Sequence, residues 1–334
     1  MAAAAAKEAC PTEAEKHAAL LDPAGEAMAR EAPGAFNVTF ATSKGNFRVE
    51  VRREWAPRGA DRFYNLVRHG FFDSTRFYRV SARRRARGRG GAGLTRGAPT
   101  PPQKVLKNWV CQFGVNGDPA VSAVYNYEND RPGAILADDP VRASNERGTV
   151  SYSAAYTADE RAVNRTTEIY INYRNNSRLD AHGFAPIGRV VAGMDVVDKM
   201  YDGYGEMADV CDLHPELGNT CAGVNETLLY TEGEQYLAAE FPKLDRTFLA
   251  TVDPPYDCAT AGPAPTAHHG HATSARAPKH IVTIFGVVLG LGAALFVFRV
   301  GLSKWLAYRN RQTKAARDRM NAYWRMEDDR FDDF

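Results

Sequence analysis

Two short segments place a hydrogen-bond donor among large apolar side chains, and they are the first candidates for chemistry. They are Phe77-Tyr78-Arg79-Val80 and Trp109-Val110-Cys111-Gln112. An arginine guanidinium is always charged and presents a rigid fork of N–H groups, so it can bind and polarise a carbonyl oxygen. A glutamine amide can hold a peptide backbone. Taken alone, the aromatic residues of both segments would fit a hydrophobic core equally well.

The cysteines and histidines indicate no metal site and no cofactor. No CxxC pair or His/Cys cluster has zinc spacing, and His268, His269 and His271 fit a polar stalk better than a ligand set. A disulfide between Cys211 and Cys221 would close a short loop and imply an oxidising compartment; free thiols are the alternative. The net charge of +2 gives no overall field that would favour nucleic acid.

The pattern of apolar residues predicts a mixed but mainly β chain. Residues 36–51 form two alternating runs around a glycine-containing turn, which predicts a β-hairpin. Residues 57–69 fit an amphipathic helix, and residues 71–80 return to a strand. The alternation of residues 168–173 is typical of a half-buried strand. Residues 232–243 predict a second amphipathic helix before a closing strand.

The strongest pattern runs from Gly148 to Val197. It reads GTVSYSAAY, then RTTEIYINYRNNSRLDAHGFAPIGRVVAGMDVV. This block resembles the C-terminal half of a cyclophilin, a peptidyl-prolyl cis/trans isomerase, and is most similar to a divergent group with the text RTTxxFINxxxNSRLDxxGFAPFGxVVxGMDVVD. The resemblance covers about residues 36–252, apart from insertions. It implies a closed eight-stranded antiparallel barrel capped by two helices.

Rotation about an X–Pro bond is opposed by a resonance barrier of ~18–20 kcal/mol. An enzyme can lower this barrier without proton transfer by binding the twisted amide more tightly than the planar one. The resemblance implies that Arg79 supplies the catalytic guanidinium and that Gln112 holds the substrate backbone. It also implies a set of substrate-binding residues: Phe77, Trp109, Val110, Ser153, Tyr170, Leu179 and Phe184.

Several positions depart from the family pattern. Ser153-Ala154 stands where the family has Ala-Asn, and Glu168 replaces a glutamine. Arg178 occupies the position at which cyclosporin-sensitive members carry tryptophan, and Trp109 is bulkier than the family's phenylalanine. These departures predict weak cyclosporin binding and are compatible with reduced activity. They also keep open an alternative, a non-catalytic module that only binds proline-containing segments.

An Arg/Gly/Pro-rich stretch, residues 80–104, interrupts the resemblance. It has almost no large apolar side chain and cannot bury enough surface to fold. We hypothesise that it is a disordered insertion or a retained intron, since removing it restores a continuous match. The alternative is a genuine basic loop able to contact RNA or anionic lipid. Because RNA binding would depend wholly on this stretch, no nucleic-acid partner is expected.

One apolar run predicts a membrane span. Residues 281–298 carry no charge, and the run extends to residue 302, close to the ~20 residues that a bilayer requires. Lys and Arg are concentrated after it, which predicts a cytosolic C-terminal tail and a lumenal N-terminal part. No clean signal peptide occurs in residues 1–33. We therefore expect either an additional upstream segment or targeting by the span itself.

The sequence thus predicts a membrane-tethered prolyl isomerase that acts on proline-containing client proteins in the secretory pathway. The expected parts are an Ala/Glu-rich segment that is either a short helix or unstructured, a cyclophilin-like domain, a stalk, a single transmembrane helix and a charged tail. Their bounds are 1–33, 34–252, 253–279, 281–302 and 303–334.

Overall fold

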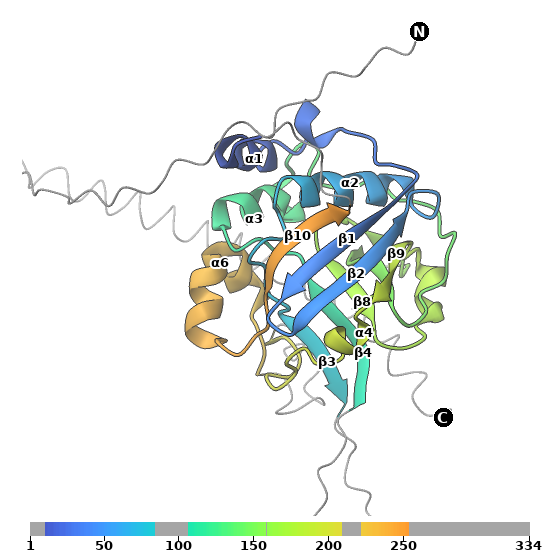
Figure 1. Cartoon of the computed structure of the whole chain (residues 1–334), viewed down its shortest axis with the longest axis vertical. Coiled ribbons are helices and arrows are strands. Elements are labelled where there is room, and N and C mark those ends of the chain that lie inside the picture. Colours follow the sequence, from blue (N-terminus) through green and yellow to red (C-terminus); the bar gives the residue numbers. More distant parts are fainter. Residues whose placement is uncertain (1–10, 84–105, 158, 209–221, 254–334) are drawn as a thin grey trace, which may run out of the picture. The chain divides into compact units, whose positions relative to one another are not determined.

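One eight-stranded antiparallel sheet forms the centre of the fold (Figure 1). The computed structural model describes residues 11–83, 106–157, 159–208 and 222–253. The strand order across the sheet is β10-β1-β2-β9-β5-β8-β4-β3, and β6 and β7 form a separate two-stranded ladder. The strand bounds are β1 Ala35–Thr42, β2 Gly45–Arg52, β3 Arg79–Arg83, β4 Leu106–Phe113, β5 Thr149–Tyr152, β6 Ala155–Tyr156, β7 Ala162–Val163, β8 Ile169–Asn172, β9 Pro186–Ala192 and β10 Thr247–Asp253.

Helices α1 and η1 precede the first strand, and the other described helices lie in the connections between strands. The α-helices are α1 Glu13–Leu20, α2 Pro57–Arg68, α3 Pro119–Tyr125, α4 Met194–Val197 and α6 Glu226–Glu240; the 3-10 helices are η1 Glu26–Met28, η2 Tyr127–Asn129 and η3 Ser177–His182. Helix α6 is longer than the predicted helix and is kinked at Gly233, whose φ is +57°. A Cβ there would lie 2.3 Å from the carbonyl oxygen of Gly117, so this close approach requires glycine.

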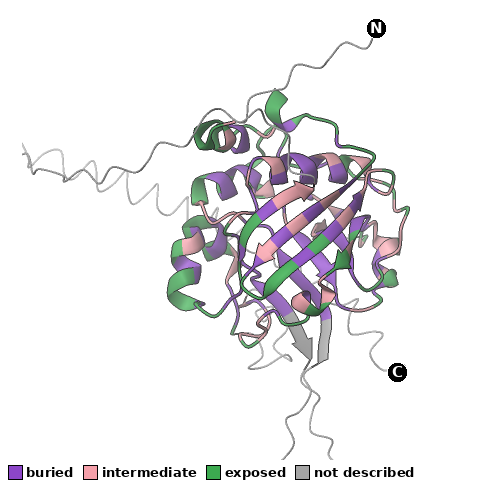
Figure 2. Cartoon of the chain, in the orientation of Figure 1, coloured by how far each residue is buried: buried purple, intermediate pink, exposed green. Residues whose placement is uncertain are grey.

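The predicted hairpin over residues 36–51 is confirmed by β1 and β2. Their inward residues alternate with more exposed ones, as the purple and lighter bands of Figure 2 show. Phe40 and Phe47 stack at a centroid separation of 4.8 Å. The rings of Phe63 from α2 and Phe113 from β4 lie 6.3 Å and 5.6 Å from Phe40. This aromatic packing fixes α2 against the sheet.

The sheet does not close into the barrel that the resemblance implied. β10 and β3 are its two edges. Just before these strands, Arg76 and Arg246 form one isolated β-bridge. The predicted strand over residues 71–80 is also shorter than expected. Residues 69–74 form turns with positive φ at Gly70 and Ser74, so the strand begins only at Arg79 and too little extended backbone remains for a closing ladder.

Strand β8 is buried on both faces, although its alternating sequence predicted a half-buried strand. All four of its residues are buried. Ile169 and Ile171 belong to the main core, whereas Tyr170 belongs to a second cluster on the opposite face. The prediction was wrong because a polar tyrosine hydroxyl does not exclude burial when it finds a hydrogen-bond partner.

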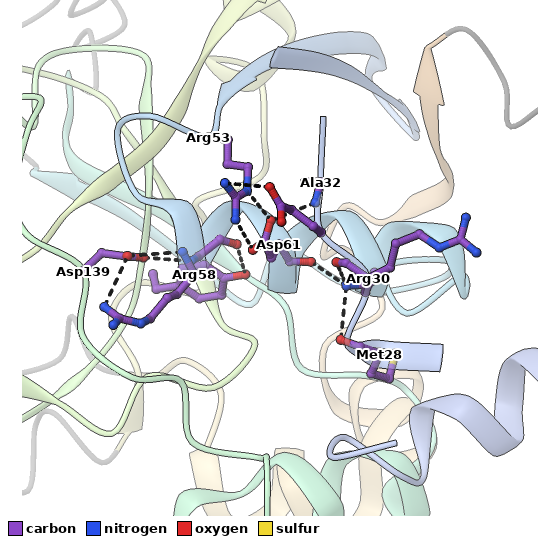
Figure 3. Close-up of polar contacts among 11 residues, drawn as sticks. Met28, Arg30, Ala32, Arg53, Arg58, Asp61 and Asp139 are labelled. Atoms are coloured by element: carbon purple, nitrogen blue, oxygen red, sulfur yellow. Dashed lines mark hydrogen bonds and ion pairs between the residues drawn. The ribbon is translucent and has the colours of Figure 1, made fainter. Parts of the chain in front are cut away.

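The N-terminal segment packs onto α2 (Figure 3). Asn65 donates through Nδ2 to the carbonyl oxygens of Met28 (3.1 Å) and Arg30 (2.7 Å). Asp61 accepts from the backbone N–H of Ala32 (2.8 Å) and from Arg53 Nε (2.8 Å). Leu20, Met28 and Ala32 are buried in the main core. Residues 11–33 therefore share a core with the sheet.

A carboxylate from a distant loop caps the start of α2. Asp139 accepts hydrogen bonds from the backbone N–H groups of Arg58 (3.2 Å) and Gly59 (2.8 Å), also drawn in Figure 3. Ala56 at the N-cap position makes no side-chain cap, so Asp139 satisfies donors that the helix itself leaves unpaired and complements the helix dipole.

The interrupting stretch enters at the end of the β3–β4 hairpin. Its first residues continue β3, because Val80 pairs with Cys111 and Arg83 pairs with Leu106. Residues 84–105 lie outside the described part of the chain, as do Cys211, Cys221, the stalk, the predicted span at 281–302 and the tail. Within the described residues, no helix is long and apolar enough to cross a membrane.

Candidate active site

The sheet register brings the two donor segments together. Arg79 of β3 is directly opposite Gln112 of β4, and Gln112 is opposite Tyr170 of β8. Side chains that are opposite each other on antiparallel strands share a face. The neighbouring pair, Val80 and Cys111, packs into the main core on the other face. Arg79, Gln112 and Tyr170 therefore form a row on the face that points away from that core.

The guanidinium of Arg79 is buried and held at two sides. Its Nε and Nη2 donate to the two carboxylate oxygens of Glu206 at 2.6 Å and 3.3 Å. Its Nη1 donates to Gln112 Oε1 at 3.3 Å. Only 9% of the Arg79 side chain is exposed, against 14% for Glu206. The predicted catalytic pair, Arg79 and Gln112, is thus in direct contact.

Glu168 anchors the other side of Gln112. It accepts hydrogen bonds from Gln112 Nε2 (2.8 Å), from the hydroxyl of Tyr230 (2.5 Å) and from the hydroxyl of Tyr78. Burial raises the pKa of both phenols well above the usual value, and the nearby Glu168 charge adds to this shift. Both tyrosines therefore remain donors at neutral pH. We refer to these residues as the polar cluster: Tyr78, Arg79, Gln112, Ser153, Glu168, Glu206 and Tyr230.

Ser153, which sequence analysis predicts to bind substrate, contacts Gln112 within the polar cluster. Gln112 Nε2 lies 3.3 Å from Ser153 Oγ, and the backbone N–H of Ser153 donates to the carbonyl of Glu168 (2.9 Å). Gln112 is therefore fixed through its oxygen by Arg79 and through its nitrogen by Glu168 and Ser153.

Five of the predicted substrate-binding residues meet in one apolar cluster. Trp109, Val110, Tyr170, Leu179 and Phe184 are all buried together. Tyr156 and Ala162, from the small β6–β7 ladder, complete this aromatic cluster, and the Tyr156 ring lies 5.5 Å from that of Phe184. Tyr170 links the aromatic cluster to the polar cluster, since it is opposite Gln112 in the sheet.

Phe77 is the exception among the predicted substrate-binding residues. It is fully buried in the main core, and its ring lies 4.6 Å from Phe113 and 6.3 Å from Phe47. Phe77 lies outside β3, which begins at Arg79, so the two-residue alternation that would place it beside Arg79 does not apply. The structure assigns Phe77 to the core.

A buried asparagine, Asn145, forms hydrogen bonds with two residues of the aromatic cluster, Tyr170 and Phe184. Asn145 Oδ1 accepts from Ser151 Oγ (2.8 Å) and from the Tyr170 hydroxyl (3.2 Å). Its Nδ2 donates to Asp180 Oδ1 (2.7 Å) and to the Phe184 carbonyl (2.9 Å). Asn145 thus links β5, β8 and η3 to the backbone at Phe184.

Arg178, one of the departures from the family pattern, lies against the aromatic cluster. Its guanidinium carbon is 4.1 Å from the centroid of the Trp109 ring, which is a cation–π geometry. The charged side chain that replaces the family's tryptophan therefore covers part of the indole.

Together, the two clusters combine a fixed positive donor, an amide side chain and an adjoining group of buried apolar side chains, which are the kinds of group that amide rotation uses. Within the described residues, no group of three or more His, Cys, Asp or Glu side chains could hold a metal ion.

Sequence analysis did not identify Glu206, Tyr230, Asn145, Tyr156 or Ala162 as site residues. Glu206 follows α4 and Tyr230 lies on α6, so both reach the site through long-range contacts that no local pattern encodes. Glu168 was the one sequence signal for these contacts. A glutamate beside a buried strand needs hydrogen-bond donors, and the hydroxyls of Tyr78 and Tyr230 supply them.

Residues 37–212 match the family model for cyclophilin type peptidyl-prolyl cis-trans isomerase/CLD. A peptidyl-prolyl cis-trans isomerase of Acinetobacter baylyi is 26% identical over 168 residues, which cover 49% of this chain and 70% of the relative. Peptidyl-prolyl cis-trans isomerase A of Dickeya dadantii is 28% identical over 168 residues, with the same coverage.

Among solved structures, a cyclophilin type peptidyl-prolyl cis-trans isomerase of Cryptosporidium parvum is 15% identical, covers 49% of this chain and 82% of its own, and has a TM-score of 0.33. The same protein in the presence of the dipeptide ala-pro is 16% identical, with 48% and 82% coverage and a TM-score of 0.33. The family match spans more than half of the 334 residues. The chain therefore belongs to the family of cyclophilin-type peptidyl-prolyl cis-trans isomerases.

Proposed function

We propose that this protein accelerates cis/trans isomerisation of X–Pro bonds in polypeptide clients. The observation that carries the proposal is the contact between Arg79 Nη1 and Gln112 Oε1, on the sheet face that also carries Tyr170 of the aromatic cluster. In this proposal Arg79 donates to the prolyl amide and Gln112 holds the adjacent backbone. The aromatic cluster, with Trp109 and Phe184, receives the proline ring.

The chemistry needs no nucleophile and no proton transfer. Isomerisation requires only that the amide lose its planarity, because resonance is then interrupted and the C–N bond can rotate. A guanidinium fixed by side chains stabilises the twisted amide without reorganising during the reaction. The hydrogen bonds to Glu206 and Gln112 provide that fixation.

A second candidate is a non-catalytic module that binds proline-containing segments. The bidentate contact with Glu206 favours it, since a carboxylate at 2.6 Å lowers the local positive potential of Arg79. The low exposure of the Arg79 side chain, 9%, favours it as well.

The two candidates differ in one measurement. The full-length chain should be added to a short peptide with one X–Pro bond, and exchange between its cis and trans forms followed by NMR. Spontaneous exchange takes tens to hundreds of seconds. Isomerase function predicts exchange that accelerates in proportion to protein concentration. Peptide shifts without faster exchange would support the binding module instead.

We further propose weak binding of cyclosporin, because the Arg178 guanidinium lies over Trp109. Replacing Arg178 with tryptophan should strengthen binding about tenfold, the equivalent of ~1.4 kcal/mol, since it restores an aromatic contact. Isothermal titration of the full-length chain and of the Arg178→Trp variant tests this. Tight binding by the unaltered chain, or an unchanged affinity in the variant, would contradict the prediction.

The setting that we propose is a membrane tether through residues 281–302, with the isomerase on the lumenal side and clients in the secretory pathway. This proposal is supported by hydropathy and by the concentration of Lys and Arg after residue 298. The divergent subgroup is likewise supported by the text between Arg165 and Val197.

A further inference from the structure

We propose that Glu206 is a positioning residue for the isomerase reaction, one that sets the orientation of the Arg79 guanidinium. The inference rests on the proposed function and adds a residue that neither the sequence patterns nor the family match assigns to the site.

Glu206 binds one whole edge of the guanidinium. Its two oxygens accept from Nε (2.6 Å) and Nη2 (3.3 Å) of Arg79. A two-point contact of this kind fixes the plane of the guanidinium as well as its position. Gln112 Oε1 accepts from Nη1 (3.3 Å) on the other side. Rotation about the last bonds of the arginine side chain is therefore restrained from both sides.

The carboxylate is itself held in place by backbone contacts. Oε1 of Glu206 also accepts from the N–H of Met207 (3.0 Å), and the Glu206 carbonyl accepts from the N–H of Gly223 (3.0 Å). A Cβ on residue 223 would lie 2.4 Å from that carbonyl oxygen, so the approach of the two segments depends on glycine. Met207 packs beside Tyr78 in a buried cluster with Val224.

Such fixation has a direct catalytic consequence. A free arginine side chain samples many rotamers, and a donor that must reorient during the reaction loses part of its effect. Glu206 removes that freedom before substrate arrives. Its charge weakens the guanidinium as an electrophile, so the two effects oppose each other. We infer that orientation prevails, because Glu206 binds the Nε–Nη2 edge of the guanidinium, whereas Nη1 is directed to Gln112.

The chain offers a matched control. Arg76, three residues before Arg79, donates through Nε (2.8 Å) and Nη2 (2.5 Å) to the carboxylate of Glu234 on α6. The Arg76 side chain is 8% exposed, close to the 9% of Arg79. Arg76 Nη1 donates to the Leu244 carbonyl (3.3 Å) instead of to a site residue. This pair has the same two-point geometry and lies outside both clusters.

The test measures kcat and KM separately for three variants of the full-length chain: Glu206→Ala, Glu206→Gln and Glu234→Ala. Glu206→Ala should lower kcat about tenfold or more while KM changes little, because misplacing a catalytic group affects the transition state first. Glu206→Gln should recover most of the rate, since its Oε1 can still accept from Arg79 Nε. Glu234→Ala should leave kcat of the folded protein unchanged.

An unchanged kcat in Glu206→Ala would overturn the inference. A raised kcat would also overturn it, because the carboxylate would then be screening the charge of Arg79. The third contrary result is an equal fall in kcat in Glu206→Ala and Glu234→Ala when both variants lose the same stability. Failure of the proposed function is recognised separately. An inactive unaltered chain, or an Arg79→Ala variant as active as the unaltered chain, would remove the isomerase assignment together with the positioning role. An active chain that needs Arg79 but not Glu206 would remove the positioning role alone.

Discussion

Replacing Arg79 with alanine should lower kcat/KM for isomerisation of a proline peptide by about 10²-fold or more. The estimate follows from the loss of one preorganised donor to a reacting carbonyl group, which typically costs 10²–10³-fold. Arg79 is the only guanidinium within the described polar cluster, and its contact with Gln112 places it beside the aromatic cluster. NMR exchange on the full-length chain gives the rate.

Two further variants separate catalysis from folding. Alanine at position 79 leaves the Glu206 carboxylate, 14% exposed, without its principal cation, which is destabilising in itself. The double variant Arg79→Ala/Glu206→Gln removes both charges and should be equally inactive but better folded. Arg76→Ala removes a comparably buried guanidinium outside the site and should keep kcat/KM for the folded fraction. Activity of Arg79→Ala near the unaltered level would show that another group polarises the amide.

Replacing Asn145 with alanine should destabilise the fold by about 3–5 kcal/mol. The side chain is fully buried. Its loss would leave the hydroxyls of Ser151 and Tyr170 without this acceptor, and the Phe184 carbonyl without this donor. Each unsatisfied buried group costs about 1–3 kcal/mol, and the sum is limited because neighbouring losses are not additive.

Urea unfolding followed by circular dichroism measures this effect in the full-length chain. Asn129→Ala is the control, because Asn129 is exposed and its side chain donates to the Ala123 carbonyl at 2.7 Å; this substitution should cost about 1 kcal/mol or less. If Asn145→Ala loses no more stability than Asn129→Ala, the hydrogen bonds of Asn145 are not what holds η3 and the backbone at Phe184 to the sheet.

Local patterns predicted the elements that form from neighbouring residues. The hairpin over 36–51 and the helix that begins at Pro57 were correct because alternation and amphipathic spacing report directly on one buried face. The strand expected from residue 71 was wrong, since the turns at Gly70 and Ser74 depend on positive φ values that an apolar run does not reveal. The prediction of a closed barrel was also wrong, since the sheet has two open edges, β10 and β3.

The site was predictable only where the family resemblance supplied residues. It brought Trp109, Leu179 and Phe184 into one cluster, although each alone would pass for a core residue. It misplaced Phe77, because the resemblance gave a position in the text but did not show that β3 begins only at Arg79. Glu206 was missed because it lies 127 residues after Arg79 in the sequence. Their contact depends on the path of the chain after α4.

The docking of residues 11–33 has a consequence for how the domain is delimited. A shortened version that begins at Gly34, the boundary chosen from composition, would remove two of the three carbonyl groups that accept from the Asn65 amide. It would also uncover apolar surface that Leu20 and Met28 now shield, and such surface promotes aggregation. The packed core of this protein thus extends upstream of residue 37, where the family match begins.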